Sequence, residues 1–91
     1  MTIEQIKDVA CECFGTSKSL LDGRSRKLEV VYAKIAISNI LHSKGYSLSE
    51  IGRILGLNHT TVIHHMKTVG DRIKYDTKFR DMYNKFFELI K

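Results

Sequence analysis

Apolar residues recur along this chain at intervals of three and four, the spacing that places them on one face of a helix. No segment keeps the alternation of apolar and polar residues that a strand would show. The spacing predicts six helices, whose apolar stripes are Ile3-Ile6-Ala10-Cys13, Leu20-Leu21, Val31-Ile35-Ile37-Ile40-Leu41, Leu48-Ile51-Ile54-Leu55, Val62-Met66-Val69-Ile73 and Phe79-Met82-Tyr83-Phe86-Phe87-Ile90.

Helix-capping residues mark the ends of these segments. Five polar residues stand before a stripe and can accept a hydrogen bond from a first-turn amide: Thr2, Ser17, Ser47, Asn58 and Asp76. Proline is absent, so glycines such as Gly15 are expected to end the helices. The segment from about Leu28 to Ser43 is apolar on too many sides for a single stripe, which predicts a buried central helix. His65 is expected at the boundary of its stripe.

Residues 47–74 predict a helix-turn-helix: a short capped helix, a tight turn with a glycine, and a second amphipathic helix. On the second helix, Thr60 and His64 lie roughly opposite Val62, and Lys67 follows one turn later. The N-terminal residues of such a helix meet base edges when it lies in a major groove. The residues predicted to read bases are therefore Asn58, His59, Thr60 and Thr61.

Positive charge is concentrated in the middle of the chain. The net charge is +5, and residues 24–53 hold six Lys or Arg against two Glu, whereas residues 1–23 hold two Lys against four acidic residues. Clustered cations beside a candidate reading helix indicate a polyanionic partner. Duplex DNA is the partner that both features favour.

The run Ser47-Leu48-Ser49-Glu50-Ile51-Gly52, followed by Asn58-His59-Thr60-Thr61-Val62-Ile63-His64, resembles the C-terminal DNA-binding domain of the bacterial replication initiator DnaA. That family carries an Asp-His-Thr-Thr-Val signature here. The likeness covers nearly the whole chain and includes Leu20-Leu21, the Arg24–Lys27 loop and Ile35-Ala36. It implies an all-α, six-helix domain of the Trp-repressor-like type with an embedded helix-turn-helix, which agrees with the periodicity.

The resemblance also implies roles for matching residues. His59, Thr60 and Thr61 would contact bases in the major groove, and Asn58 would stand where the family has aspartate, which accepts but does not donate. The resemblance places a further set of residues at phosphates or in the minor groove: Arg24, Arg26, Lys27, Lys34, Ser47, Leu48, Ser49 and His64. Lys67 is added to this set because of its position on the helix face. Lys34, where the family usually has glutamine, is expected outside the core.

Other classes of function have little support in the sequence. Cys11 and Cys13 are too few for a disulfide framework and should point to nearly opposite sides of a helix. Signal-peptide, membrane-span, metal-site and P-loop patterns are absent, which predicts a cytoplasmic, nucleoid-associated protein without cofactor, metal, membrane or small-molecule substrate. We therefore expect residues 1–91 to form one free-standing, non-enzymatic domain that binds origin-like or regulatory DNA. The alternatives are a protein-interaction adaptor with this fold and a mobile-element transcription regulator.

Overall fold

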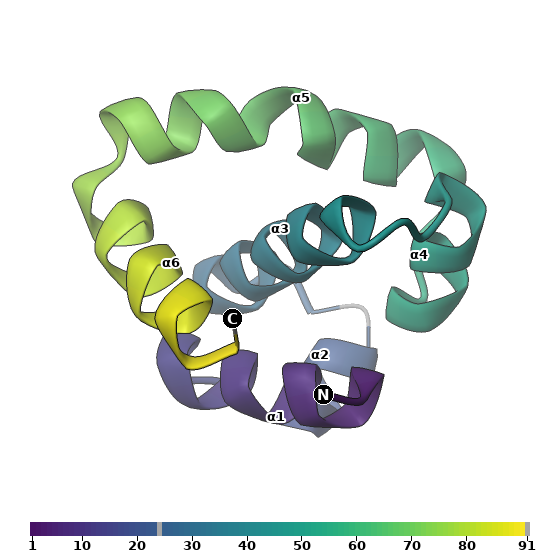
Figure 1. Cartoon of the computed structure of the whole chain (residues 1–91), viewed down its shortest axis with the longest axis horizontal. Coiled ribbons are helices and arrows are strands. Elements are labelled where there is room, and N and C mark those ends of the chain that lie inside the picture. The colour runs from purple at the N-terminus through teal and green to yellow at the C-terminus, as the bar shows by residue number, and fades with distance from the viewer. Residues whose placement is uncertain (24, 91) are drawn as a thin grey trace.

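The computed structural model describes residues 1–23 and 25–90, and within these ranges the chain forms six helices and no strand (Figure 1). The predicted all-α, six-helix class is confirmed. The helices are α1 (Ile3–Phe14), α2 (Lys18–Asp22), α3 (Leu28–Ser43), α4 (Leu48–Leu55), α5 (His59–Tyr75) and α6 (Thr77–Ile90).

The helix starts are set locally by the residues expected to cap them. Each of five side chains accepts a hydrogen bond from a first-turn amide, as predicted: Thr2, Ser17, Ser47, Asn58 and Asp76. Gly15 ends α1 in the left-handed conformation, with φ of 69°, which costs glycine no steric strain. Side-chain caps therefore account for five of the six helix starts in the described residues, and α3 is the one that lacks such a cap.

Helix α3 runs through the middle of the molecule, with α5 on one side of it and α1 on the other (Figure 1). It packs against each of the other five helices. Ten of its sixteen residues are buried, and this confirms the prediction of a central helix. The same burial on nearly every side also encloses the polar residues Lys34 and Ser38.

Helix α6 is fastened to the core where it meets α5. The Tyr32 hydroxyl donates a hydrogen bond to the Asp76 carboxylate, which also accepts from the Phe79 amide at 3.1 Å. Both bonds stabilise the charged carboxylate and hold the pKa of Asp76 below its usual value. The Arg72 guanidinium lies over the Tyr32 ring, 5.5 Å from its centroid. Asp76 therefore joins α3, α5 and α6 at one point.

The aromatic residues of α6 were expected in the core. Phe79 and Phe86 are fully buried, and the ring centroids of Phe79 and Tyr32 are 5.1 Å apart in an edge-to-face arrangement. Phe87 is the exception, because 43% of its surface is exposed. The prediction holds for the face of α6 that meets α1 and α3.

Candidate nucleic-acid interface

The turn between α4 and α5 is tightly packed. Gly56, at φ of 66°, places the turn so that the amides of Gly56 and Leu57 both donate to the Gly52 carbonyl. A Cβ on Gly52 would lie 2.7 Å from the Leu57 carbonyl oxygen, closer than carbon and oxygen approach in proteins. Glycine at position 52 is therefore what allows α4 and α5 to meet so closely.

The first turn of α5 presents polar side chains outward. Asn58, His59, Thr60 and His64 are exposed, whereas Val62 is fully buried. This is the arrangement predicted from the 100° advance per residue. Thr61 is half-buried and faces a pocket between α5 and the loop before α3.

Asn58 has one of its two polar groups already occupied. Its Oδ1 accepts a hydrogen bond from the Thr61 amide at 2.8 Å and so caps α5. Its side-chain nitrogen is a donor, and no hydrogen bond among the described residues uses it. While the cap is kept, Asn58 can therefore donate through this nitrogen, and Oδ1 has one further lone pair.

The N-terminus of α4 lies in the same helix-turn-helix and offers two amides. Ser47 and Ser49 are exposed and Leu48 is half-buried. The Glu50 amide is taken by the Ser47 hydroxyl at 3.1 Å, which leaves the amides of Leu48 and Ser49 without an intrahelical partner. The Glu50 carboxylate, whose pKa is lowered by hydrogen bonds from Ser47, adds a negative charge at this end.

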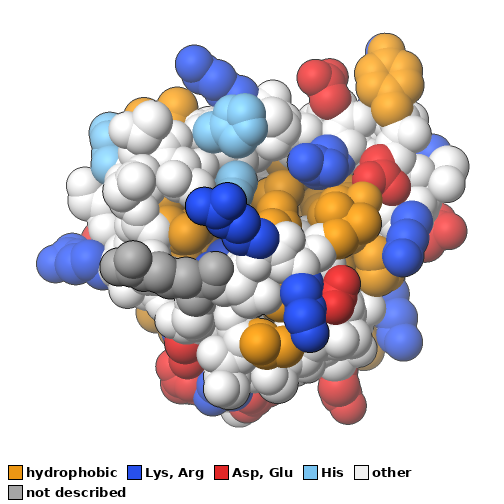
Figure 2. All heavy atoms as spheres, turned by 180° about the vertical axis from the view of Figure 1, so that it is seen from behind, with side chains coloured by type: hydrophobic (Ala, Val, Ile, Leu, Met, Phe, Trp, Pro, Cys, Tyr) orange, Lys and Arg blue, Asp and Glu red, His pale blue; other side chains and the backbone are white. Residues whose placement is uncertain are grey.

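The basic loop before α3 lies on the other side of a pocket from the first turn of α5. Arg26 and Lys27 are exposed, and Ser25 is half-buried; Arg24 lies outside the described residues. The pocket has a volume of about 580 Å³ and is lined on the loop side by Ser25 and Arg26 and on the α5 side by Asn58. Figure 2 shows histidine and basic side chains side by side on this face.

Lys34 is not where the sequence suggested. It was expected outside the core, but only 5% of its surface is exposed, and its Nζ donates to the Gly23 carbonyl at 3.0 Å. Burial lowers the pKa of its ammonium. The expectation is wrong because α3 is covered on the side that carries Lys34. His64 and Lys67, by contrast, are exposed on α5 as predicted.

His65 was expected at the core boundary and is in fact buried, with 7% of its surface exposed. Its Nδ1 has no hydrogen-bond partner among the described residues. Burial and the nearby positive charge of Lys34 and Arg72, together with His64, lower its pKa to about 4. The sequence held a signal for this burial, since His65 lies three residues after Val62 and four before Val69.

The buried neutral His65 predicts a loss of stability on mild acidification. In the unfolded chain its pKa is about 6.5, so the unfolded state binds the proton first, and stability falls as pH drops from about 6.5 towards 4. The loss should be on the order of 2 kcal/mol. Urea unfolding from pH 7 to 4.5 measures it. His65→Leu should flatten this dependence, and an unchanged slope in that variant would assign the effect to other groups.

The described part of the chain contains no group of His, Cys, Asp and Glu side chains able to hold a metal ion. Cys11 and Cys13 are both buried, and burial raises the pKa of each thiol. In residues 1–23 and 25–90, no helix has the length and apolar character needed to cross a membrane.

Known proteins resemble this chain over its whole length. A family model described as the bacterial DnaA protein helix-turn-helix matches residues 3–69. The chromosomal replication initiator protein DnaA of Bacteroides thetaiotaomicron is 34% identical over 93 residues, which cover 100% of this chain and 20% of that protein. The DnaA proteins of a Synechococcus strain and of Porphyromonas gingivalis are 32% and 28% identical, with 100% and 99% of this chain covered and 20% of each relative.

The chain thus spans about a fifth of the length of the curated relatives it matches. The matching region of those relatives is their C-terminal part. The helix-turn-helix at α4 and α5 falls inside the matched residues 3–69. The chain belongs to the bacterial DnaA helix-turn-helix family, as a DNA-binding rather than a catalytic domain.

Proposed function

We propose that this chain binds duplex DNA in a sequence-specific manner, with α5 in the major groove and the loop before α3 in the adjacent minor groove. The observation that carries the proposal is the outward polar first turn of α5, held by the glycine-dependent turn after α4. A helix presented in this way enters the major groove with its N-terminal residues at the base edges. Origin-like or regulatory sites are the proposed targets, read in the cytoplasm without cofactor or ATP hydrolysis.

The residues divide into two groups by the kind of contact proposed. Base contacts come from the first turn of α5: Asn58, through its side-chain nitrogen, with His59, Thr60 and Thr61. Phosphate contacts come from the side chains of His64 and Lys67 and from the start of α4 at Ser47, Leu48 and Ser49, because helix N-termini offer free amides to anions. The exposed Arg26 and Lys27, with Arg24, are proposed for the minor groove.

Selection from a library of random duplexes tests the proposal directly. Enrichment of a common sequence, followed by tighter binding to that sequence than to a scrambled duplex, is the expected result. Binding to no duplex at all would overturn the proposal and favour the protein-interaction alternative.

The proposed contacts predict strong salt dependence. With about five or six phosphates neutralised, the logarithm of the binding constant should fall against the logarithm of salt with a slope near −5. Fluorescence anisotropy of a labelled duplex between low and moderate salt measures this slope. A slope near zero would contradict it. Lys85→Ala, which removes an exposed cation on α6, is the control expected to leave the slope unchanged.

A further inference from the structure

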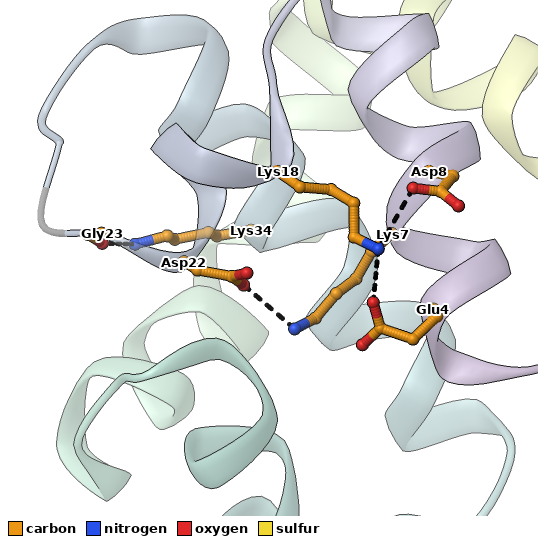
Figure 3. A network of polar contacts seen from close by, with 7 residues as sticks. All are labelled: Glu4, Lys7, Asp8, Lys18, Asp22, Gly23 and Lys34. Carbon is orange, nitrogen blue, oxygen red and sulfur yellow. Dashed lines mark hydrogen bonds and ion pairs between the residues drawn. The ribbon is translucent and has the colours of Figure 1, made fainter.

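Two buried lysines from different helices meet at the end of α2. Lys7 of α1 and Lys34 of α3 have 6% and 5% of their surface exposed. The Lys7 Nζ contacts the Asp22 carboxylate at 3.0 Å, and the Lys34 Nζ donates to the next residue's carbonyl, at Gly23, also at 3.0 Å. Figure 3 shows the Lys34 ammonium at Gly23 and the Lys7 ammonium at the neighbouring Asp22 carboxylate.

Burying two ammonium groups costs free energy, which hydrogen bonds and ion pairs must offset. A buried ammonium is destabilising when its hydrogen bonds are not satisfied, and burial lowers the pKa of Lys34 while Asp22 opposes that shift. Helix α2 has only five residues, and Leu21 is its buried apolar anchor. The two lysines therefore hold the end of α2 at Asp22 and Gly23.

The start of α2 is tied to the core as well. Lys18 forms ion pairs with Glu4 and with Asp8, the latter at 3.4 Å, and both partners belong to α1 (Figure 3). With Lys18 at its start and Lys7 and Lys34 at its end, α2 is held at both ends.

The end of α2 also abuts the helix-turn-helix. The Asp22 carbonyl oxygen lies 3.8 Å from the position that a Cβ on Gly56 would occupy. Gly23 and Lys34 line the same pocket as Arg26 and Asn58. The contacts of Lys7 and Lys34 with Asp22 and Gly23 therefore lie between the basic loop and the first turn of α5, and they help to fix the distance between these two segments.

We propose that Lys7 and Lys34 are positioning residues, which place the basic loop relative to α5 so that both engage adjacent grooves and which do not themselves touch DNA. This inference rests on the proposed function. It replaces the expected phosphate contact of Lys34, whose ammonium is enclosed and bound to Gly23.

The salt slope separates positioning from contact. A lysine that neutralises a phosphate contributes about one unit of slope, so its removal flattens the slope by about that amount. Removal of a positioning lysine should weaken binding but leave the slope within about half a unit of the parent value, because the displaced loop keeps its own cations at the phosphate backbone. The same variants should lose discrimination in the minor groove, because the loop no longer lies in register with α5.

The experiment uses the full chain and a duplex selected for the parent protein. Adenines are replaced one at a time by 2,6-diaminopurine, which adds an amino group in the minor groove and leaves the major-groove edge unchanged. In the parent, replacement under the loop should weaken binding about fivefold or more. Lys7→Met and Lys34→Met should lose this penalty at an unchanged salt slope. Lys44→Met, at an exposed position after α3, should behave as the parent.

Lys34→Gln removes the charge and keeps a polar side chain, one bond shorter than that of lysine. Because the Lys34 ammonium is proposed not to touch DNA, this variant should keep the parent slope. If circular dichroism shows either Met variant to be unfolded, the salt slope of Lys34→Gln still tests whether the charge of Lys34 acts on DNA. A slope flattened by about one unit in Lys34→Gln would show that the charge acts on DNA and would overturn the inference.

The outcomes distinguish this inference from the proposed function. If the parent binds no duplex, the proposed function fails and the inference with it. If the parent binds and reads its site but shows no diaminopurine penalty, the proposed minor-groove contact of the loop is wrong, and the inference fails with it. If the parent shows the penalty and both Met variants keep it, the inference alone is wrong.

Discussion

Gly52→Ala is expected to lower the free energy of unfolding by about 1–3 kcal/mol, the range for overpacking a close-packed site. The added Cβ would meet the Leu57 carbonyl oxygen at 2.7 Å. That oxygen belongs to the backbone of the turn and cannot rotate away as a flexible side chain would. The turn must open, which strains the bond from the Leu57 amide to the Gly52 carbonyl. Urea unfolding of parent and variant measures the change.

Gly70→Ala is the matched control for this prediction. Gly70 lies in α5 and is exposed, and apart from its chain neighbours and the local helix backbone no atom of the described residues lies within 4 Å of the position of an added Cβ. Alanine there should raise stability by about 0.5–1 kcal/mol, because glycine loses more backbone entropy in a helix. If both variants changed stability in the same direction and by a similar amount, the close contact at Gly52 would not be the cause. Gly52→Ala should also weaken DNA binding under conditions where it remains folded, because α5 is displaced.

Thr60→Ala should collapse the ratio of specific to non-specific DNA affinity. Thr60 is exposed in the first turn of α5, on the side away from the buried Val62. Loss of a base contact costs about 1–3 kcal/mol on the preferred site and little on random duplex. Titrations on a selected site and on a scrambled duplex, at one salt concentration, measure the ratio. Circular dichroism should show the variant folded, since no core side chain is removed.

Lys67→Ala is the control that separates base reading from backbone attraction. Lys67 is exposed on α5, so its removal should weaken binding to both duplexes alike and flatten the salt slope by about one unit. Lys34, which was also expected at the phosphates or in the minor groove, does not suit this purpose because it is buried. If Thr60→Ala weakened both duplexes equally while Lys67→Ala erased discrimination, the proposed position of α5 in the groove would be wrong.

The parts of the fold that could be predicted from sequence are those fixed by neighbouring residues. Ser47 and Glu50 cap each other three residues apart, and Asn58 binds an amide three residues away. Such contacts depend on local spacing alone, so the starts of α4 and α5 and the outward face of Thr60 followed from the pattern.

The sequence was misleading where the surroundings of a side chain come from distant segments. Lys34 is bonded to Gly23, and Lys7 to a carboxylate fifteen residues away. A lysine is ordinarily expected in solvent, and only the packing of α2 against α1 and α3 shows these two to be enclosed. His65 is a different case. Its spacing from Val62 and Val69 indicated burial, but its ring is polar, and a position at the edge of the core was expected.

Asp76 joins the C-terminal end of α5 to α3 and α6, and this joint lies at the opposite end of α5 from Thr60. Helix α5 has seventeen residues, so its reading tip lies about 25 Å from the joint at a rise of 1.5 Å per residue. A tilt of about 5° at the joint would carry the tip sideways by about 2 Å over that length, enough to break a hydrogen bond to a base edge. In the proposed complex, the hydrogen bond from the Tyr32 hydroxyl, at the far end of α5, would therefore help to set the angle at which Thr60 meets a base edge.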